Sequence, residues 1–346
     1  MMVLARLPSV ANSILICISI VLFSLAAAAE SRASPIHESV RLDTAWGPVH
    51  GTLLVPAGRG KFPLALLIAG SGPMDRDGNS ALLPGANNSL KLLAEGLADH
   101  GIASLRYDKR GIGKSASKTF NEAELRFETY VDDAAAWVEQ LRRDSRFSTI
   151  TVVGHSEGSL IGILAVQRSA ADAFISVAGP ARPAGQVLRT QLRPQLKPAL
   201  WRASEQILGA LESGRTIESV PPPLLALYRP SVQPYLISWF RYTPAREIAR
   251  LSVPVMIVQG TTDIQVDVAE AKALLEAYPG ASPVIVEGMN HVLKLVPANA
   301  IQQRVSYSNP SLPVVPKVMD EISKFVHAAP RRQRRAPEPG RRSVIR

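Results

Sequence analysis

The feature that most constrains this chain is the pentapeptide GHSEG at residues 154–158, which directly follows the run TITVV at residues 149–153. β-branched residues favour a strand, and the residues after Gly158 favour a helix. A serine between a strand and a helix lies on a sharp turn that exposes its hydroxyl, and the flanking glycines let the backbone pass close to both elements. The segment therefore predicts a strand–turn–helix unit with Ser156 at its tip.

Strand-like and helix-like segments alternate along most of the chain. Two alternating segments, 36–43 and 49–55, predict an opening antiparallel hairpin. Residues 64–68 form a continuous apolar run, as expected of a strand buried on both faces, and further strands are predicted at 102–105, 149–153, 173–177, 255–258 and 284–286. Helical patterns lie at 90–97, 127–141, 157–168, 268–278 and 316–326. This alternation predicts an α/β fold with a doubly wound, mostly parallel sheet of about eight strands.

The N-terminus has the order of a secretory signal. Arg6 is followed by a 12-residue apolar run, residues 14–25, and then by four alanines ending at Ala29. The run is shorter than the roughly 20 residues of a membrane span. We expect residues 1–29 to be a signal peptide cleaved near Ala29, with a secreted or periplasmic product; an uncleaved membrane anchor is the alternative. The one cysteine, Cys17, lies in this segment, so the mature chain would form no disulfide.

The C-terminus is strongly basic. Residues 330–346 contain seven arginines and one glutamate among prolines, which accounts for more than half of the net charge of +10. Such a composition predicts a disordered tail that can contact anionic surfaces. No nucleic-acid-binding motif accompanies it, so we expect no nucleic-acid partner.

The alternation of strands and helices stops between residues 181 and 250. This segment holds nine prolines, and an unstructured loop of that length is improbable. We interpret it as a helical cap inserted between two parts of a core, 36–180 and 251–329. Its aromatic residues either line a substrate pocket or pack the cap onto the core: Trp201, Tyr228, Tyr235, Trp239 and Phe240.

A serine is a useful nucleophile only when a base removes its proton, and that base is usually a histidine. Of the six histidines, His291 is the best candidate because it follows the last core strand in a glycine-containing loop, EGMNH at 287–291. His155 directly precedes Ser156, where its side chain should point away from the serine hydroxyl. The others lie in the opening hairpin, in a helix-to-strand turn or at the end of the last helix: His37, His50, His100 and His327.

A catalytic histidine needs an acid that fixes its tautomer. Asp263 follows the penultimate core strand by a few residues and is our preferred candidate. Asp267 is the alternative, but it lies where the next helix begins and fits a helix cap better.

The order serine, aspartate, histidine resembles the α/β-hydrolase superfamily from about residue 36 to 328. More narrowly, GSGPMDRD at 70–77 resembles an esterase and serine-aminopeptidase-like branch, and RYDKRGIGKS at 106–115 is similar to the superfamily's R-x-D-x-R-G-x-G-x-S stretch. The resemblance implies that the backbone N–H groups of Ser71 and Glu157 form the oxyanion hole. The superfamily usually has His-Gly before the donor that corresponds to Ser71; here it is Ala69-Gly70, a departure that the narrower branch shares.

These residues predict a serine hydrolase that cleaves a carboxylic ester of a small-molecule acyl substrate, with Ser156 as nucleophile, His291 as base and Asp263 as the orienting acid. No metal-ligand cluster, phosphate loop or cofactor fingerprint is visible in the sequence, so we expect no metal or cofactor. Two alternatives remain: an aminopeptidase or amidase that uses the same residues, and a non-catalytic relative that binds surfaces through its basic tail.

Overall fold

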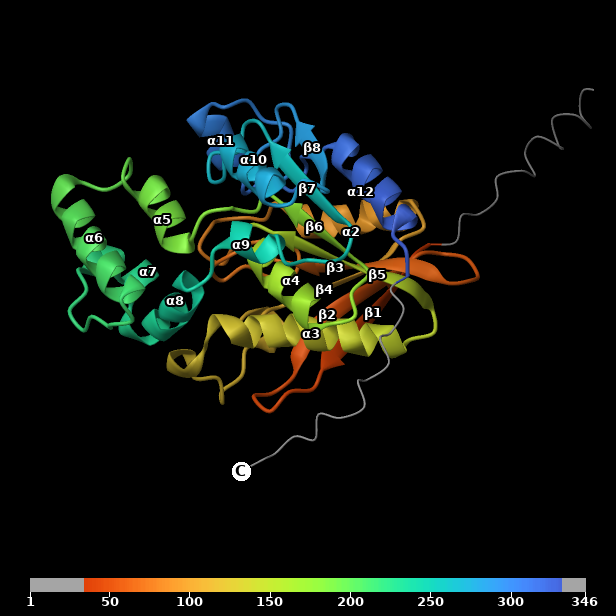
Figure 1. The fold of residues 1–346 in the computed structure, drawn as a ribbon, viewed down its shortest axis with the longest axis horizontal. Helices are drawn as coiled ribbons and strands as arrows, with labels where there is room; N and C mark the ends of the chain where they lie inside the picture. Colours follow the sequence, from red (N-terminus) through yellow and green to blue (C-terminus); the bar gives the residue numbers. More distant parts are fainter. Residues whose placement is uncertain (1–33, 332–346) are drawn as a thin grey trace, which may run out of the picture. The chain divides into compact units, whose positions relative to one another are not determined.

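The computed structural model describes residues 34–331. The predicted signal peptide, Cys17 and most of the arginine-rich segment lie outside the described residues. Residues 35–331 form one compact unit built on an eight-stranded sheet (Figure 1). Its strands, in chain order, are β1 (Ile36–Leu42), β2 (Val49–Val55), β3 (Phe62–Ile68), β4 (Ala103–Tyr107), β5 (Phe147–His155), β6 (Ala173–Val177), β7 (Val255–Gly260) and β8 (Ser282–Val286).

The spatial order of the strands is β1-β2-β4-β3-β5-β6-β7-β8. β1 and β2 form an antiparallel hairpin, and β2 pairs antiparallel with β4. All other neighbours are parallel, from β4 through to β8. The prediction of a mostly parallel sheet of about eight strands is therefore confirmed.

Helices cover both faces of the sheet. α2 (Ser89–Asp99) and α12 (Pro316–Ala328) pack on one face, and α3 (Phe127–Arg143), α4 (Glu157–Arg168) and α10 (Val268–Ala277) on the other. Successive strand residues point to opposite faces, so Val152 belongs to the α3/α4 core and Val153 to the α2/α12 core. Both cores are apolar, which explains the continuous apolar runs of the central strands.

Residues 181–250 form helices between β6 and β7. They are α5 (Ala184–Leu192), α6 (Pro198–Glu212), α7 (Leu225–Tyr228), α8 (Gln233–Phe240) and α9 (Pro244–Ile248), with 3-10 turns η3 (Pro222–Leu224) and η4 (Pro230–Val232). Several prolines occupy first-turn positions, where their missing N–H costs nothing. In Figure 1, α5 to α8 gather at the left of the sheet.

The aromatic residues of this insertion are mainly packing residues. The Trp239 ring of α8 stacks on Phe127 at the start of α3, with ring centroids 5.9 Å apart. Tyr228 is fully buried and its hydroxyl is hydrogen-bonded to Ser204 across 2.9 Å. The Phe127 N–H also donates to Ser238 of α8 across 2.8 Å. These contacts join the insertion to the core.

Three short elements were not expected from the sequence: α11 (Ala300–Ser306), η1 (Gly113–Ser115) and η2 (Glu122–Glu124). α11 begins after Asn299, whose side chain accepts hydrogen bonds from the N–H groups of Ile301 and Gln302. No helix within residues 34–331 has the length and apolar character needed to cross a membrane.

The parallel register brings four loops to one edge of the sheet. Ile68 at the end of β3 is level with Gly154 of β5, and Gly260 at the end of β7 is level with Val286 of β8. The loops that follow β3, β5, β7 and β8 therefore all leave the sheet at its carboxyl edge. This is the edge at which open α/β sheets bind their ligands.

Candidate active site

Ser156 lies between β5 and α4 in a backbone conformation that non-glycine residues seldom adopt, with φ 56° and ψ −123°. The turn is tight enough to require both flanking glycines. A Cβ on Gly154 would lie 2.2 Å from the Gly158 carbonyl oxygen, and a Cβ on Gly158 would lie 2.4 Å from the carbonyl oxygen of Ile68 in β3. The close packing of β5, α4 and β3 thus holds Ser156 in its strained position.

Asp263 and His291 are directly hydrogen-bonded, with 2.8 Å between Asp263 Oδ2 and His291 Nδ1. Both residues are buried. The other carboxylate oxygen of Asp263 accepts the N–H groups of Gln265 and Val266, at 2.8 and 3.0 Å. Burial alone would raise the pKa of Asp263, but His291 and these N–H donors together lower it.

The lowered pKa keeps Asp263 charged at neutral pH. A charged carboxylate can only accept a hydrogen bond, so Nδ1 of His291 donates to Asp263 and the other ring nitrogen, Nε2, is the one placed to act as a general base.

The loops that carry Asp263 and His291 are hydrogen-bonded to each other. The N–H of Thr262 donates to the Met289 carbonyl across 3.1 Å, and the Gly288 N–H donates to the Thr261 hydroxyl across 2.9 Å. Asn290, next to His291, donates to Ser306 of α11 across 2.8 Å. The unexpected helix α11 is thus part of the support of the histidine loop.

Asp267, the alternative acid, has a different place. Its side chain accepts the Ala269 N–H across 2.8 Å at the start of α10. This is the hydrogen bond of a helix N-cap. Of the two aspartates, only Asp263 is hydrogen-bonded to His291.

His155 has a contact that the sequence analysis missed. Its Nε2 donates to the backbone carbonyl of His291 across 2.8 Å, and the two rings lie 4.8 Å apart between centroids. Burial, with the neighbouring His291, lowers the pKa of His155 to about 4, so the ring is neutral. The residue before Ser156 therefore connects the nucleophile turn to the histidine loop.

Within the described residues, no hydrogen bond joins the Ser156 hydroxyl to His291. In unliganded enzymes this bond is often long and shortens only when substrate is bound. The structure thus joins Asp263 to His291 directly, and relates both to Ser156 through the neighbouring His155.

The loop after β3 lies against Ser156. A Cβ on Gly70 would be 3.1 Å from Ser156 Cβ, which places the Gly70–Ser71 peptide beside Ser156. Glu157 is the first residue of α4, a position whose N–H has no acceptor inside the helix. The Ser71 N–H donates to no other group in the described part of the chain.

Residues at the end of β4 hold this loop in place. Arg106 pairs with Asp77 across 2.7 Å, and Asp108 accepts two hydrogen bonds from Arg76, at 2.7 and 2.8 Å. Arg76 and Asp108 bury most of their side chains. These ion pairs explain why charged residues follow the glycine-rich start of the loop.

Lys109 is a second residue that sequence reasoning did not single out. Its Nζ donates to the Gly70 carbonyl and to the Glu157 carboxylate, both across 2.7 Å. The hydroxyl of Tyr235, in α8, donates to the other oxygen of that carboxylate across 2.5 Å. Two features of the sequence could have indicated this ion pair. Lys109 lies inside the 106–115 motif, and an acid, Glu157, directly follows Ser156.

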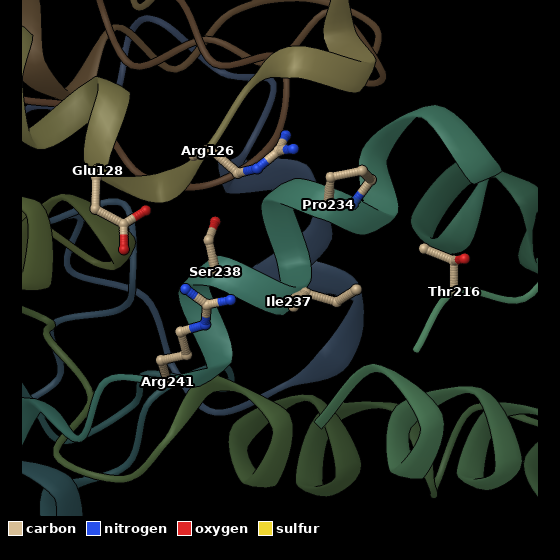
Figure 2. Close-up of a pocket in the computed structure, with 7 residues that line it drawn as sticks. All are labelled: Arg126, Glu128, Thr216, Pro234, Ile237, Ser238 and Arg241. Carbon is tan, nitrogen blue, oxygen red and sulfur yellow. The ribbon is translucent and has the colours of Figure 1, made fainter. Parts of the chain in front are cut away.

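A cavity of about 400 Å³ lies between the start of α3 and α8 (Figure 2). Its lining mixes two arginines and a glutamate with smaller groups: Arg126, Glu128, Thr216, Pro234, Ile237, Ser238 and Arg241. Ser156, Asp263 and His291 do not line it, so it is separate from the candidate active site. Among residues 34–331, no group of three or more His, Cys, Asp or Glu side chains is arranged to hold a metal ion.

Residues 85–215 match the family model of the serine aminopeptidases of family S33. The chain is 29% identical to Esterase EstD of Thermotoga maritima over 279 residues, which is 80% of this chain and 65% of the length of EstD. The chain therefore spans slightly less than two thirds of that relative.

Solved structures of the same fold include Est1E and a puromycin-hydrolyzing peptidase. Est1E from Butyrivibrio proteoclasticus with bound ferulic acid superimposes with a TM-score of 0.58 at 20% identity, covering 84% of this chain and 98% of Est1E. A puromycin-hydrolyzing peptidase of Mycobacterium tuberculosis gives a TM-score of 0.54 at 17% identity, covering 85% of this chain and 39% of the peptidase. At these identities the likeness concerns the fold.

Proposed function

We propose that this chain, which belongs to the α/β-hydrolases of the esterase and serine-aminopeptidase type, hydrolyses carboxylic esters through an acyl-enzyme on Ser156. The observation that carries the proposal is the 2.8 Å hydrogen bond between Asp263 and His291, at the same sheet edge as the strained Ser156. A buried carboxylate that orients an imidazole beside a serine on a strand-to-helix turn is the arrangement that activates a serine hydroxyl.

In the proposed reaction, His291 Nε2 removes the proton of the Ser156 hydroxyl as the oxygen attacks the acyl carbon. The carbonyl oxygen becomes an oxyanion, which accepts hydrogen bonds from the N–H groups of Ser71 and Glu157. His291 then gives its proton to the leaving alcohol oxygen. Water attacks the acyl-enzyme in the same way, releases the acid and restores Ser156.

The carboxylates around the site support an ester rather than an aminoacyl substrate. An aminopeptidase needs an acceptor for the charged amine of its substrate. The carboxylates of the loop after β3, of the end of β4 and of the Ser156 and His291 neighbourhood already accept hydrogen bonds from protein donors: Asp75, Asp77, Asp108, Glu157 and Asp263. The similarity to Esterase EstD points the same way.

The second candidate is an aminopeptidase or amidase on the same three residues, favoured by the description of the matching family model. It differs from the first candidate in the leaving group, which is an amine rather than an alcohol. The third possibility, a surface-binding relative without activity, makes no use of the Asp263–His291 bond.

We also propose that the chain acts outside the cytoplasm as a secreted or periplasmic protein, because its N-terminal sequence has the order of a signal peptide. The intact mass of the protein recovered from the periplasm or medium tests this: loss of about the first 29 residues supports it, and a full-length product in the membrane fraction favours the anchor. The arginine-rich end can then contact anionic surfaces.

The test of the catalytic proposal starts with a fluorophosphonate probe, which reacts with activated serines. The wild-type chain should be labelled at Ser156 and the folded Ser156→Ala variant should not. Turnover of p-nitrophenyl acetate, butyrate and octanoate is then compared with that of aminoacyl p-nitroanilides. Faster anilide cleavage would replace the esterase proposal by the peptidase one, and a folded, unlabelled, inactive wild type would overturn both.

A further inference from the structure

Lys109 occupies an unusual position for a lysine. Its side chain is 1% exposed, and its ammonium is committed to two acceptors, the Gly70 carbonyl and the Glu157 carboxylate, each at 2.7 Å. It also lies 5.0 Å from the centroid of the Tyr130 ring, a distance at which cation and ring attract each other. A buried ammonium is costly unless such partners are fixed around it.

The first acceptor belongs to the peptide bond that carries one expected oxyanion donor. The Gly70 carbonyl and the Ser71 N–H are parts of the same planar peptide, and the described chain has no cis peptide bonds. In a trans peptide the C=O and N–H point in opposite directions. An ammonium on the carbonyl therefore fixes the direction in which the Ser71 N–H points, and polarises that N–H so that it donates more strongly.

The second acceptor belongs to the residue that carries the other expected donor. Glu157 follows Ser156 directly, and both oxygens of its carboxylate are held: one by Lys109 and one by the Tyr235 hydroxyl. Burial and the negative charge of Glu157 raise the pKa of Tyr235 well above its usual value, so its hydroxyl stays a donor. The first turn of α4 is thereby linked to the Gly70–Ser71 peptide through one ammonium.

Stability alone does not explain this arrangement. A buried ion pair contributes about as much as a well-packed apolar pair of the same volume, because both charges lose their hydration. What apolar side chains would not provide is a fixed link between two backbone segments that are far apart in the sequence.

We propose that Lys109 is a positioning residue of the oxyanion hole, which orients the Gly70–Ser71 peptide and the start of α4 toward the same point. The inference rests on the proposed function. Tyr235 extends the link to α8, so the insertion between β6 and β7 is mechanically connected to the oxyanion donors.

The experiment compares two buried ion pairs. In the first variant, Lys109→Met with Glu157→Gln, the link is removed without leaving a buried charge unpaired. In the control, Arg142→Met with Asp172→Asn, a pair with side chains 7% and 0% exposed is removed near the start of β6, at the opposite edge of the sheet. Both should lower the midpoint of thermal unfolding, but only the first should weaken the oxyanion hole.

For the first variant we expect kcat on p-nitrophenyl acetate to fall at least about tenfold, with KM nearly unchanged. This is less than the fall expected when an oxyanion donor is removed outright, because the variant only misplaces the donors. The carbonyl stretching band of the acyl-enzyme should move to higher wavenumber, because weaker hydrogen bonds polarise that carbonyl less. The control should keep both the wild-type kcat and the wild-type band. An equal loss of kcat in the two variants, or an unmoved band in the first, would overturn the proposal.

If the first variant does not fold, Tyr235→Phe provides the test, because it removes one donor to Glu157 and leaves Lys109 in place. The acyl-enzyme carbonyl band of this variant should also move to higher wavenumber, by less than the band of the double variant. An unmoved band in Tyr235→Phe overturns the proposal.

A further readout separates this inference from the esterase proposal. If the wild type cleaves no ester but reacts with the fluorophosphonate probe, the esterase proposal fails. The role of Lys109 is then tested by the rate of labelling, because phosphonylation also places negative charge on the oxygen in the oxyanion hole. The rate should then fall in the first variant and not in the control. An unlabelled wild type overturns both proposals.

Discussion

The Nε2 atom of His155 donates a hydrogen bond to the backbone carbonyl of His291 across 2.8 Å. The residue before the proposed nucleophile thus fixes the backbone of the residue proposed as the base. The two rings also pack at 4.8 Å between centroids. The placement of His291 therefore depends on the strand that ends in His155, as well as on Asp263.

The first prediction concerns the donor at position 155. His155→Gln can keep an N–H that reaches the His291 carbonyl, whereas His155→Phe fills the space and leaves the buried carbonyl without that donor. We expect kcat/KM to fall more than about tenfold in the Phe variant, because small misplacement of a catalytic group is costly, and less in the Gln variant. Steady-state kinetics on p-nitrophenyl butyrate checks this, and equal losses in both variants would remove the role assigned to the hydrogen bond.

The second prediction concerns pH and stability. The folded-state pKa of His155 is about 4, against 6.5 for an unperturbed histidine, so between these values the unfolded chain binds more protons. The stability contributed by the neutral ring is complete above pH 6.5 and is lost as the pH falls toward 4, by up to about 1.4 kcal/mol per pH unit. Urea unfolding of the wild type and His155→Gln at a series of pH values should show a shallower slope in the variant. Parallel slopes would contradict the assignment.

The third prediction separates the two aspartates. In Asp263→Asn the side-chain oxygen stays on the Gln265 and Val266 N–H groups, so the NH2 group must face His291 Nδ1. A donor there forces the imidazole into the wrong tautomer, and kcat should fall by about 10⁴-fold. Asp267→Asn should keep activity, since asparagine is also a good N-cap. Kinetics of both variants decides the matter: a loss confined to Asp267→Asn would move the acid to that residue.

The fourth prediction uses two glycines that lie close to Ser156. Alanine at Gly158 would place its Cβ 2.4 Å from a backbone oxygen of β3. The gain in helix propensity, about 1 kcal/mol, cannot offset such a clash, so we expect a loss of more than about 4 kcal/mol in the free energy of unfolding. Denaturant titration measures it, and a variant as stable as the wild type would show that α4 can move away from β3.

Alanine at Gly70 meets softer neighbours, Ser156 Cβ at 3.1 Å and His155 Nδ1 at 3.4 Å. We expect a smaller cost of about 1–3 kcal/mol but a clear loss of kcat, because the displaced atoms belong to the proposed nucleophile and to the residue before it. The Gly158 variant should therefore lose mainly stability and the Gly70 variant mainly activity. Denaturant titration and steady-state kinetics on both variants provide the comparison.

Much of the fold follows from the sequence, because its elements depend on local patterns. The apolar runs that become β3, β5 and β6 are buried on both faces, and only a doubly covered sheet accommodates such runs. α11 was missed because it is a short polar helix held by Asn299 and by contacts to the histidine loop, which are tertiary. The aromatics of residues 181–250 could have served a pocket or packing, and it is the stacking of Trp239 on Phe127 that identifies packing.

The sequence by itself determined the elements that carry Ser156, Asp263 and His291, because the order of the strands and the places where they end follow from local patterns along the chain. Only the tertiary structure decided which side chains meet across those elements: Asp263 rather than Asp267 on His291, His155 on the His291 carbonyl, and Lys109 between Gly70 and Glu157. The physical reason is distance along the chain. Lys109 lies 39 residues from Gly70 and 48 from Glu157, and only the parallel register of the sheet brings the three together.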